Sequence, residues 1–326
     1  MSESTNVAIA CQGGGSHSAF TAGVLQEFCE RWDDELGDRY ALVGFSGASG
    51  GAFNALAAWY ACVTGAPGDA VGLLDGLWDD LSATDGGDRL LNEWLVGVSR
   101  IESAGFPVPS VSPYQLPGDR WGKQRIRDAL ERHLDFAAIP ELCERTAPEL
   151  VVGTVNVNAG TFETFRNEDV TVDAVLASAA IPALFEAVEL HGHAHWDGLF
   201  SQNPPISDLM AVPDERRPEE LWIVQVNPQT RDGTPSSLDV IADRRNELSG
   251  NLSLNQELRF VEMVNGWIDE GYLPEGRFTH TEVRRIEMGQ QYHCSTKLDR
   301  SPGFIGELKA LGRERAAAFL DERDPD

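Results

Sequence analysis

Short apolar runs alternate along the chain with longer segments in which apolar residues recur every three or four positions. The apolar runs are typical of buried strands, and they lie at residues 7–11, 40–43, 149–156 and 220–227. The periodic segments predict helices, and they lie at residues 20–28, 53–61, 69–81, 90–99, 124–134, 172–180, 238–269 and 305–323. Strands that alternate with helices favour an α/β fold, in which helices cover both faces of a mainly parallel sheet.

The chain has the length of one large α/β domain or of two small ones. No internal repeat or linker divides it, so we expect a single domain over residues 1–326, with its core motifs within about 6–230. Glycines and prolines interrupt the pattern between residues 83 and 122. A long broken segment of this kind is either a lid over a site or a surface excursion. Residues 235–326 form a C-terminal extension that we expect to be helical, apart from a strand at 281–288.

The segment Gly44–Ala52 lies between a predicted strand and a predicted helix. Its spacing Gly47-x-Ser49-x-Gly51 is that of a nucleophile elbow. A serine in so tight a turn has a strained backbone, and neighbours without a Cβ allow the strand and the helix to approach each other. We expect Ser49 at the helix N-terminus, where free N–H groups favour developing negative charge.

A second glycine-rich turn, residues 13–16, directly follows the first predicted strand. Such a turn can cradle a phosphate, supply N–H donors to an oxyanion, or only reverse the chain. The dinucleotide fingerprint Gly-x-Gly-x-x-Gly fails at its third glycine, because Ser18 stands there. Asp33 and Asp34 stand near the distance expected of a ribose-binding acid, so a dinucleotide site stays an alternative. The chain has no Gly-Lys-Ser/Thr, which excludes a P-loop.

A serine nucleophile needs a base that accepts its proton. His280 and His293 are available for a Ser-Asp-His triad. Three further histidines alternate along one predicted strand, a pattern that suggests a metal but has no fourth ligand cluster beside it: His191, His193 and His195. Asp197 follows that strand and begins an Asp-Gly turn, so it projects from a strand end either as a base or only as a turn residue.

The charge of the chain is strongly acidic, since 52 Asp and Glu against 26 Lys and Arg give a net charge of −26. This balance argues against a nucleic-acid partner, and an acidic surface with so few lysines suggests a protein that works in high salt. The five cysteines form no Cys-x-x-Cys, which favours reduced thiols in a cytoplasm over disulfides or a zinc site. No long apolar run and no signal-type segment is present, so we expect a cytoplasmic protein without a transmembrane segment.

Four motifs, taken in this order, resemble the patatin-like acyl hydrolases over about residues 6–230. They are the glycines at 13–15, the elbow at 47–51, the segment Ala-Ser-Ala-Ala-Ile-Pro-Ala-Leu-Phe at 177–185, and Asp197-Gly198 followed by Asn203-Pro204-Pro205. The resemblance implies a three-layer α/β/α sandwich. It also implies a Ser-Asp dyad that needs no catalytic histidine, no metal and no cofactor.

Carried over to this chain, the resemblance makes Ser49 the nucleophile and Asp197 its base. It makes the glycine-rich loop the oxyanion hole, joined by analogy with other elbows by the residue after the nucleophile. The donors are then the backbone N–H groups of Gly13, Gly14, Gly15, Ser16 and Gly50. The family loop reads Gly-Gly-Gly-x-Arg/Lys-Gly, whereas this chain has His17 and Ser18 at the last two positions, and it has Leu199 where the family prefers Gly or Ala.

The family resemblance implies phospholipid or acylglycerol substrates, so we expect hydrolysis of lipid esters at a membrane or granule surface. Polyhydroxyalkanoate storage granules also present ester bonds at an apolar surface, and a depolymerase that uses the same dyad is an alternative. A third alternative is a non-catalytic protein that binds lipid or granule surfaces on the same scaffold.

Overall fold

The computed structural model describes residues 4–323 apart from 110, 116–117, 144–146, 183, 201 and 275–276. Its centre is an eight-stranded sheet in the order β5-β6-β3-β2-β1-β7-β8, with β4 paired to β3. The strands are β1 Thr5–Cys11, β2 Tyr40–Gly47, β3 Glu149–Asn156, β4 Thr161–Arg166, β5 Val188–Leu190, β6 His193–Asp197, β7 Glu220–Gln225 and β8 Glu282–Glu287. Strands β3, β2, β1, β7 and β8 pair in parallel, whereas β4, β5 and β6 pair antiparallel.

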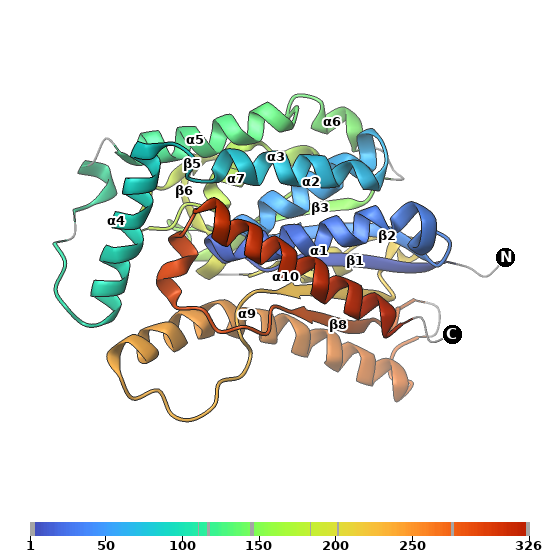
Figure 1. Ribbon diagram of the computed structural model, residues 1–326. Helices are drawn as coiled ribbons and strands as arrows, with labels where there is room; N and C mark the ends of the chain where they lie inside the picture. Colours follow the sequence, from blue (N-terminus) through green and yellow to red (C-terminus); the bar gives the residue numbers. More distant parts are fainter. Residues whose placement is uncertain are drawn as a thin grey trace.

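Helices connect most of these strands (Figure 1). They are α1 Ala19–Glu30, α2 Gly50–Thr64, α3 Ala70–Leu81, α4 Gly86–Ser103, α5 Gly118–His133, α6 Ile139–Leu142, α7 Val172–Ser178, α8 Ser207–Met210, α9 Leu238–Asp269 and α10 Pro302–Asp321. Three short 3₁₀ helices adjoin the candidate site: η1 Gly15–Ser18, η6 Gly198–Phe200 and η8 Cys294–Leu298.

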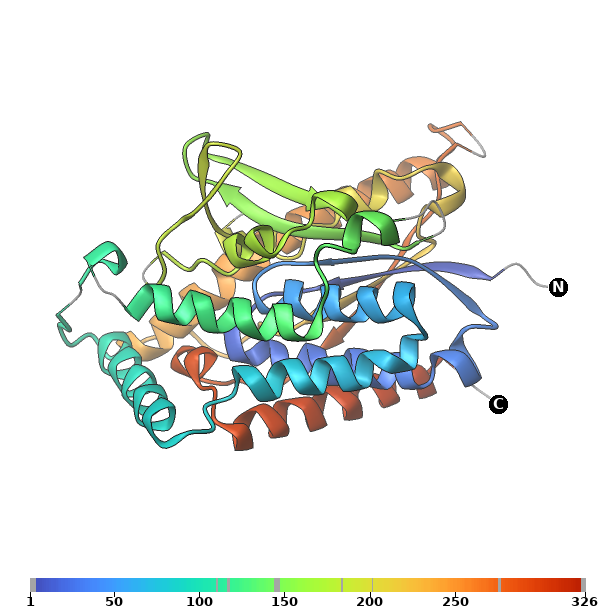
Figure 2. The same ribbon diagram turned by 90° about the horizontal axis from the view of Figure 1, so that it is seen from above.

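Alternate residues of β1 point to opposite faces of the sheet and meet two separate apolar cores. Val7 and Ile9 belong to the larger core, to which α1, α2, α3 and α10 contribute. Ala8 and Ala10 belong to the smaller core, to which α8 and α9 contribute. Helices therefore cover both faces of the sheet (Figures 1 and 2). The predicted three-layer α/β/α fold with a mainly parallel sheet is confirmed.

Most predicted elements are present, with ends that shift by a few residues. The helix expected at 238–269 has those bounds as α9, and the strand expected at 281–288 is β8, which pairs with β7. The helix expected near 90–99 is longer: α4 has 18 residues, and the Asp85 side chain caps it by accepting the Asp88 N–H at 2.8 Å. The C-terminal extension contributes β8 and η8 as well as helices.

The register of the sheet brings three loops to one level at the carboxyl ends of the parallel strands. Cys11, the last residue of β1, pairs with Gly47 of β2 and with Val224 of β7. The loops after β1, β2 and β7 therefore begin side by side. The strand order also reverses at β1, and ligands of parallel α/β sheets bind at such a point. Helix α4 lies across this end of the molecule (Figure 1).

Candidate active site

Ser49 occupies the sharp turn between β2 and α2. Its backbone has φ 53° and ψ −132°, a strained conformation for a residue with a Cβ. The turn is compact, because a Cβ at Gly51 would overlap the carbonyl of Cys11 and one at Gly47 would lie 2.5 Å from the carbonyl carbon of Gly51. Both elbow glycines are therefore needed for β1, β2 and α2 to approach each other.

Ser178, the last residue of α7, holds this strained turn. The Ser49 N–H donates to the Ser178 carbonyl at 3.1 Å and to its hydroxyl at 2.9 Å. The Ser178 hydroxyl in turn donates to the Gly153 carbonyl of β3 at 2.7 Å. The Ala-Ser-Ala-Ala motif at 177–180 thus positions the elbow. Ala183, further along the same motif, lies outside the described residues.

Asp197 ends β6 and faces Ser49. Antiparallel pairing of β6 with β3 places Asp197 opposite Thr154, and the Asp197 N–H donates to the Ala180 carbonyl at 3.1 Å. The Asp197 carboxylate accepts hydrogen bonds from the Ser49 hydroxyl and from the Leu199 N–H, the latter at 2.8 Å. Leu199 contributes its backbone to this contact, so its departure from the family residue leaves the bond intact.

Both side chains lie in a water-poor environment, since Ser49 is 6% exposed and Asp197 is 1% exposed. Burial raises the pKa of Asp197 to about 7, against the opposing effects of the Leu199 N–H, the Ser49 hydroxyl and the positive charge of Lys297. A carboxyl group with a pKa near neutrality is matched to accepting and returning a proton at neutral pH. The pair can therefore pass a proton between hydroxyl and carboxylate.

The glycine-rich loop lies against the elbow, where Gly13 has no room for a Cβ beside the carbonyl of Ala48. The Gly13 N–H donates to Asn203 Oδ1 at 2.6 Å, and Asn203 Nδ2 donates back to the Gly13 carbonyl at 3.2 Å. The Gly13 N–H is therefore already engaged and does not point to an oxyanion. Four of the expected donors have no acceptor among the described residues: the N–H groups of Gly14, Gly15, Ser16 and Gly50.

The two departures from the family loop have different environments. His17 Nε2 lies 2.8 Å from Thr296 Oγ1. Burial, and then the charge of Lys297, lower the pKa of His17 well below its usual range, so the ring is neutral at pH 7 and does not replace the cationic family residue. Ser18 packs against the elbow, because its Cβ lies 2.8 Å from the position that a Cβ of Gly50 would take.

Lys297 of η8 brings a positive charge to the loop from a distant part of the chain. Its Nζ donates to Asn227 Oδ1 at 2.7 Å and to Asn246 Oδ1 at 2.5 Å, and its carbonyl packs against Gly15, which has φ 58°. Burial lowers the pKa of Lys297 to about 8, while its charge favours the ionised form of Asp197. Sequence reasoning missed this residue, although only three lysines occur in the chain.

Buried amide side chains join the start of the loop to β7 and α9. Gln12 Oε1 accepts from the N–H groups of Val226 at 3.0 Å and Asn227 at 2.9 Å. Gln12 Nε2 donates to Asn251 Oδ1 at 2.9 Å. These bonds fix the loop after β1 relative to the loop after β7.

The histidines considered as triad bases have other partners. His280 Nε2 lies 3.7 Å from Asp269 and its side chain is 50% exposed. His293 Nε2 lies 3.8 Å from Asp243. Among the described residues, no histidine makes a hydrogen bond or ion pair with Ser49, so the sequence-based alternative of a triad has no structural support here.

Two further alternatives from the sequence are a ribose-binding acid and a metal site of alternating histidines. Asp33 and Asp34 are exposed beyond the far end of α1, which has 12 residues and is about 18 Å long, so they stand far from the glycine-rich loop. His191 lies in the turn before β6 with φ 52°. The buried His195 lies 3.0 Å from Glu163 Oε2 and forms a structural pair with it.

Within the described part of the chain, one group of side chains has metal-ligand character: the ligand atoms of Asp243, His293 and Cys294 lie within 4.8 Å of one another. The Cys294 N–H already donates to Asp243 Oδ1 at 2.8 Å, and burial raises the pKa of the Cys294 thiol to about 12. The cationic Lys297 lines the same small cavity. A protonated thiol beside an ammonium group fits a metal ion poorly.

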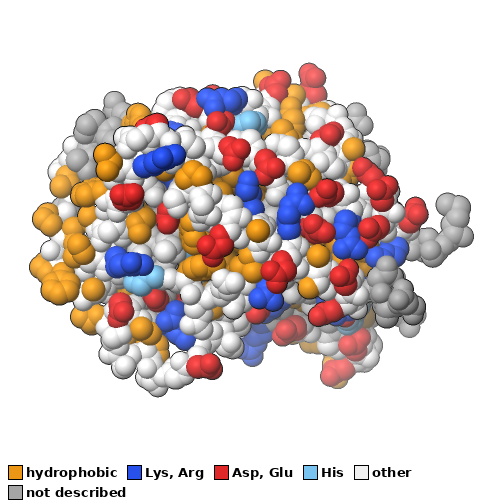
Figure 3. All heavy atoms as spheres, viewed as in Figure 1, with side chains coloured by type: hydrophobic (Ala, Val, Ile, Leu, Met, Phe, Trp, Pro, Cys, Tyr) orange, Lys and Arg blue, Asp and Glu red, His pale blue; other side chains and the backbone are white. Residues whose placement is uncertain are grey.

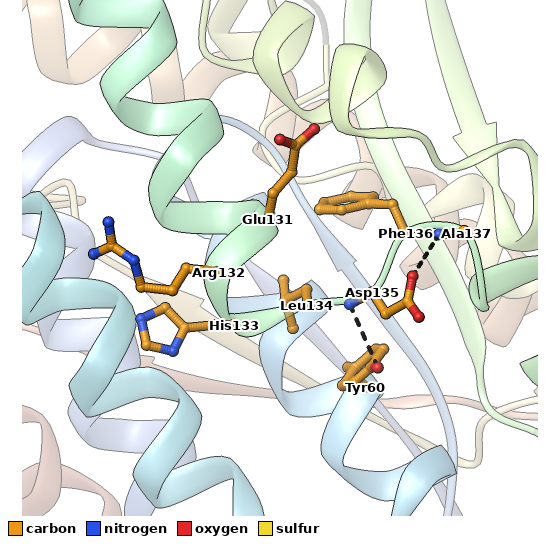
Figure 4. Close-up of a pocket in the computed structure, with 8 residues that line it drawn as sticks. All are labelled: Tyr60, Glu131, Arg132, His133, Leu134, Asp135, Phe136 and Ala137. Atoms are coloured by element: carbon orange, nitrogen blue, oxygen red, sulfur yellow. Dashed lines mark hydrogen bonds between the residues drawn. The ribbon is translucent and has the colours of Figure 1, made fainter.

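A surface hollow of about 460 Å³ lies at the C-terminal end of α5 (Figure 4). Tyr60 of α2 and Asp135 line it, and the Asp135 N–H lies 3.4 Å from the Tyr60 hydroxyl. Ser49 precedes the first residue of α2, so Tyr60 stands about 15 Å further along the helix axis. The hollow is therefore separate from the elbow.

The chain matches the family model of patatin-like phospholipase over residues 9–210. It therefore belongs to the patatin-like phospholipases, which are lipid ester hydrolases. A comparison with curated proteins gives no match. No helix in the described ranges has the length and hydrophobicity to cross a lipid bilayer.

Several solved structures are similar at low identity, and VipD and ExoU are among them. VipD from Legionella pneumophila is 16% identical, with a TM-score of 0.48, over 98% of this chain and 67% of VipD. ExoU, in its complex with SpcU from the type III secretion system of Pseudomonas aeruginosa, is 13% identical with a TM-score of 0.38, over 98% of this chain. The chain spans about half of that ExoU chain, with 52% covered.

Proposed function

We propose that the protein cleaves carboxylic esters of lipids through an acyl-enzyme, with Ser49 as nucleophile and Asp197 as base. The observation that carries this proposal is the hydrogen bond from the Ser49 hydroxyl to a buried carboxylate whose pKa is about 7. Family membership supports the substrate class. The absence of a histidine partner among the described contacts of Ser49 supports a two-residue device.

In the acylation step, Ser49 Oγ attacks the ester carbonyl while its proton passes to the Asp197 carboxylate. The resulting tetrahedral oxyanion accepts hydrogen bonds from backbone N–H groups, for which Gly14, Gly15, Ser16 and Gly50 are the candidates. Each such donor contributes about 10²–10³ to the rate. The carbon–oxygen bond to the alcohol then breaks, and the leaving alkoxide takes the proton from Asp197.

In the deacylation step, a water molecule attacks the acyl-Ser49 carbonyl and gives its proton to Asp197. The second oxyanion uses the same N–H donors. Collapse of this intermediate releases the carboxylic acid, and the proton on Asp197 returns to Ser49 Oγ. The N-terminus of α2, which begins at Gly50, favours the negative charge in both steps.

The direct test is Ser49→Ala, assayed with a p-nitrophenyl acyl ester. We expect the rate above background to fall by about 10⁴-fold or more. Ser46→Ala is the matched control, because Ser46 is a buried serine of β2, the strand that leads into the elbow, and its hydroxyl has no partner among the described residues. Ester cleavage that survives in pure Ser49→Ala protein would rule the assignment out.

The choice of ester is a second question. Phospholipid and triacylglycerol should be cleaved faster than polyhydroxyalkanoate if the protein is a lipid acyl hydrolase. A preference for the polyester would favour a granule depolymerase with the same dyad. Binding to lipid or granules with no turnover of any ester would favour the non-catalytic alternative.

A further inference from the structure

Helix α4 carries polar side chains inward and apolar side chains outward. The side chains that it buries are Asp88 and Asn92. Leu90, Trp94 and Ile101 lie on the opposite side of the helix and are 70%, 61% and 51% exposed. A helix on the surface of a globular protein ordinarily turns its apolar stripe to the core. Helix α4 has the reverse arrangement.

Polar contacts hold α4 in this orientation. The Asp88 carboxylate binds Arg125 of α5 at 2.7 Å and Arg300 at 2.5 Å. The Asn92 side chain accepts from the Arg300 N–H at 2.8 Å and donates to Asp299 at 3.0 Å. The helix is therefore anchored through its polar side, and its apolar side stays available to a partner.

The exposed apolar surface continues beyond α4. Phe106 is 65% exposed, and Leu238, at the start of α9, is 60% exposed and packs against Gly105. We define the apolar rim as Leu90, Trp94, Ile101, Phe106 and Leu238. Figure 3 shows hydrophobic side chains gathered on the side of the molecule where α4 and the start of α9 lie.

The charge around the rim differs from that of the rest of the chain. Residues 86–133, which include α4 and α5, hold 6 acidic and 7 basic residues, whereas the whole chain holds 52 and 26. The segment that carries most of the rim is thus nearly neutral in a strongly acidic protein. A near-neutral apolar surface with exposed tryptophan and phenylalanine suits the boundary between lipid headgroups and acyl chains.

The rim adjoins the candidate active site. Helix α4 packs against η8, which contains Lys297, and Ser103 Oγ near the end of α4 lies 3.4 Å from His293 Nε2. The rim also lies at the end of the molecule where β1 and β2 terminate (Figure 1). We propose that the apolar rim docks on the surface of a phospholipid bilayer and holds the Ser49 site against it. This docking rests on the proposed lipid ester hydrolysis.

The test separates binding from turnover by using Ser49→Ala protein and vesicles of phosphatidylcholine. Adding Leu90→Ser, Trp94→Ser and Ile101→Ser should lower the vesicle partition coefficient by about tenfold or more, because each change removes apolar area that lipid would cover. All three side chains are mainly exposed, so we expect an unchanged thermal melt. The vesicle partition coefficient of the Ser49→Ala protein should not fall when NaCl is raised from about 0.1 M to 1 M, since salt does not screen apolar contacts.

The matched control is a second exposed apolar stripe, on the later part of α9. Phe260, Met263 and Trp267 are 54%, 43% and 40% exposed, and their change to serine should leave the partition unchanged. An equal loss in both triple variants, or no loss in the rim variant, overturns the proposal. A dimer that depends on the rim, together with no vesicle binding, also overturns it, because the occupant is then a second copy of the chain.

Turnover distinguishes this proposal from the proposed function. With Ser49 intact, the rim variant should cleave a soluble p-nitrophenyl ester at the parent rate, while its cleavage of bilayer phospholipid should fall by about tenfold, as the partition does. An unchanged rate of bilayer phospholipid cleavage by the rim variant would contradict docking through the apolar rim. If the parent protein cleaves neither substrate, the proposed function fails, and the Ser49→Ala partition measurement still decides whether the rim docks.

Discussion

The two halves of the candidate site are held in place by different means. In the elbow half, backbone hydrogen bonds fix the reacting residues, because the Ser49 N–H donates to Ser178 and the Asp197 N–H donates to the Ala180 carbonyl. These contacts join three short motifs that lie far apart along the chain, since Ser49 and Ser178 are 129 positions apart. Each of these motifs can be recognised in the sequence by itself, so the nucleophile and the candidate base can be found before the structure is known.

In the loop half, side chains rather than backbone groups hold the glycine-rich loop and supply charge. Asn203 holds Gly13, Gln12 binds Asn251 of α9, and Lys297 brings a positive charge from η8. Both halves therefore depend on contacts between distant segments, but recognisable motifs mark the reacting residues, whereas the charge of Lys297 comes from a segment that carries no motif. Changes in the elbow half should affect the rate most, and changes in the loop half should affect its pH dependence.

The largest effect is expected for Asp197→Asn. The amide can still accept the Leu199 N–H but cannot accept the Ser49 proton, so kcat/KM for a p-nitrophenyl ester should fall by about 10³-fold or more. His280→Ala and His293→Ala serve as controls and should retain most of the activity. Activity of Asp197→Asn within tenfold of the parent would show that another group is the base.

A smaller loss is expected for Ser178→Ala, which removes one acceptor of the Ser49 N–H and the bond to Gly153. The elbow should be less well fixed, and kcat should fall by about tenfold, with a loss in the free energy of unfolding of about 1–3 kcal/mol. Ser82→Ala is the control, because Ser82 is a buried serine that donates to the Trp78 carbonyl at 2.7 Å. Equal kcat values for the two variants would contradict a special role of Ser178.

Lys297→Met tests the loop half through pH. An active base must be ionised, so kcat/KM should rise with pH through about 7, the pKa of Asp197. Without the Lys297 charge the ionised form of Asp197 is less favoured, so the rise in kcat/KM should shift to a pH that is higher by about one unit. Lys309→Met, which loses a contact with Asp75 at 2.7 Å, is the control and should leave the pH of this rise unchanged. If the rise in kcat/KM of Lys297→Met occurs at the same pH as in the unchanged protein, the Lys297 charge does not act on Asp197.

The smallest effect concerns stability. The pKa of Asp197 is raised in the folded protein from 3.8 to about 7, so the folded state binds more protons than the unfolded state between these values. The contribution of Asp197 to stability is therefore complete below about pH 4 and is lost as pH rises through 7. Asp197→Asn should melt a few degrees above the parent at pH 8 and show no such gain at pH 4. A lower melting temperature of the variant at pH 8 would contradict this assignment of cause.

Much of the fold could be predicted from the sequence, because apolar runs and periodic segments report local burial. The helix at 238–269 and the strand at 149–156 have the predicted bounds. The elbow and Asp197 were recognised through spacing and resemblance. Lys297 was not, because its approach to the site depends on where η8 packs in three dimensions. The polar anchoring of α4 was missed for the same reason, since Asp88 acquires its partner Arg300 only in the folded chain.

The most direct measurement of the central claim is the rate and position of labelling by a fluorophosphonate, followed by mass spectrometry of the peptides. If Ser49 is the nucleophile and Asp197 its base, we expect one adduct on Ser49, no adduct in Ser49→Ala, and labelling slower by about 10²-fold or more in Asp197→Asn. An adduct on another residue, or labelling of Asp197→Asn at the parent rate, would contradict it.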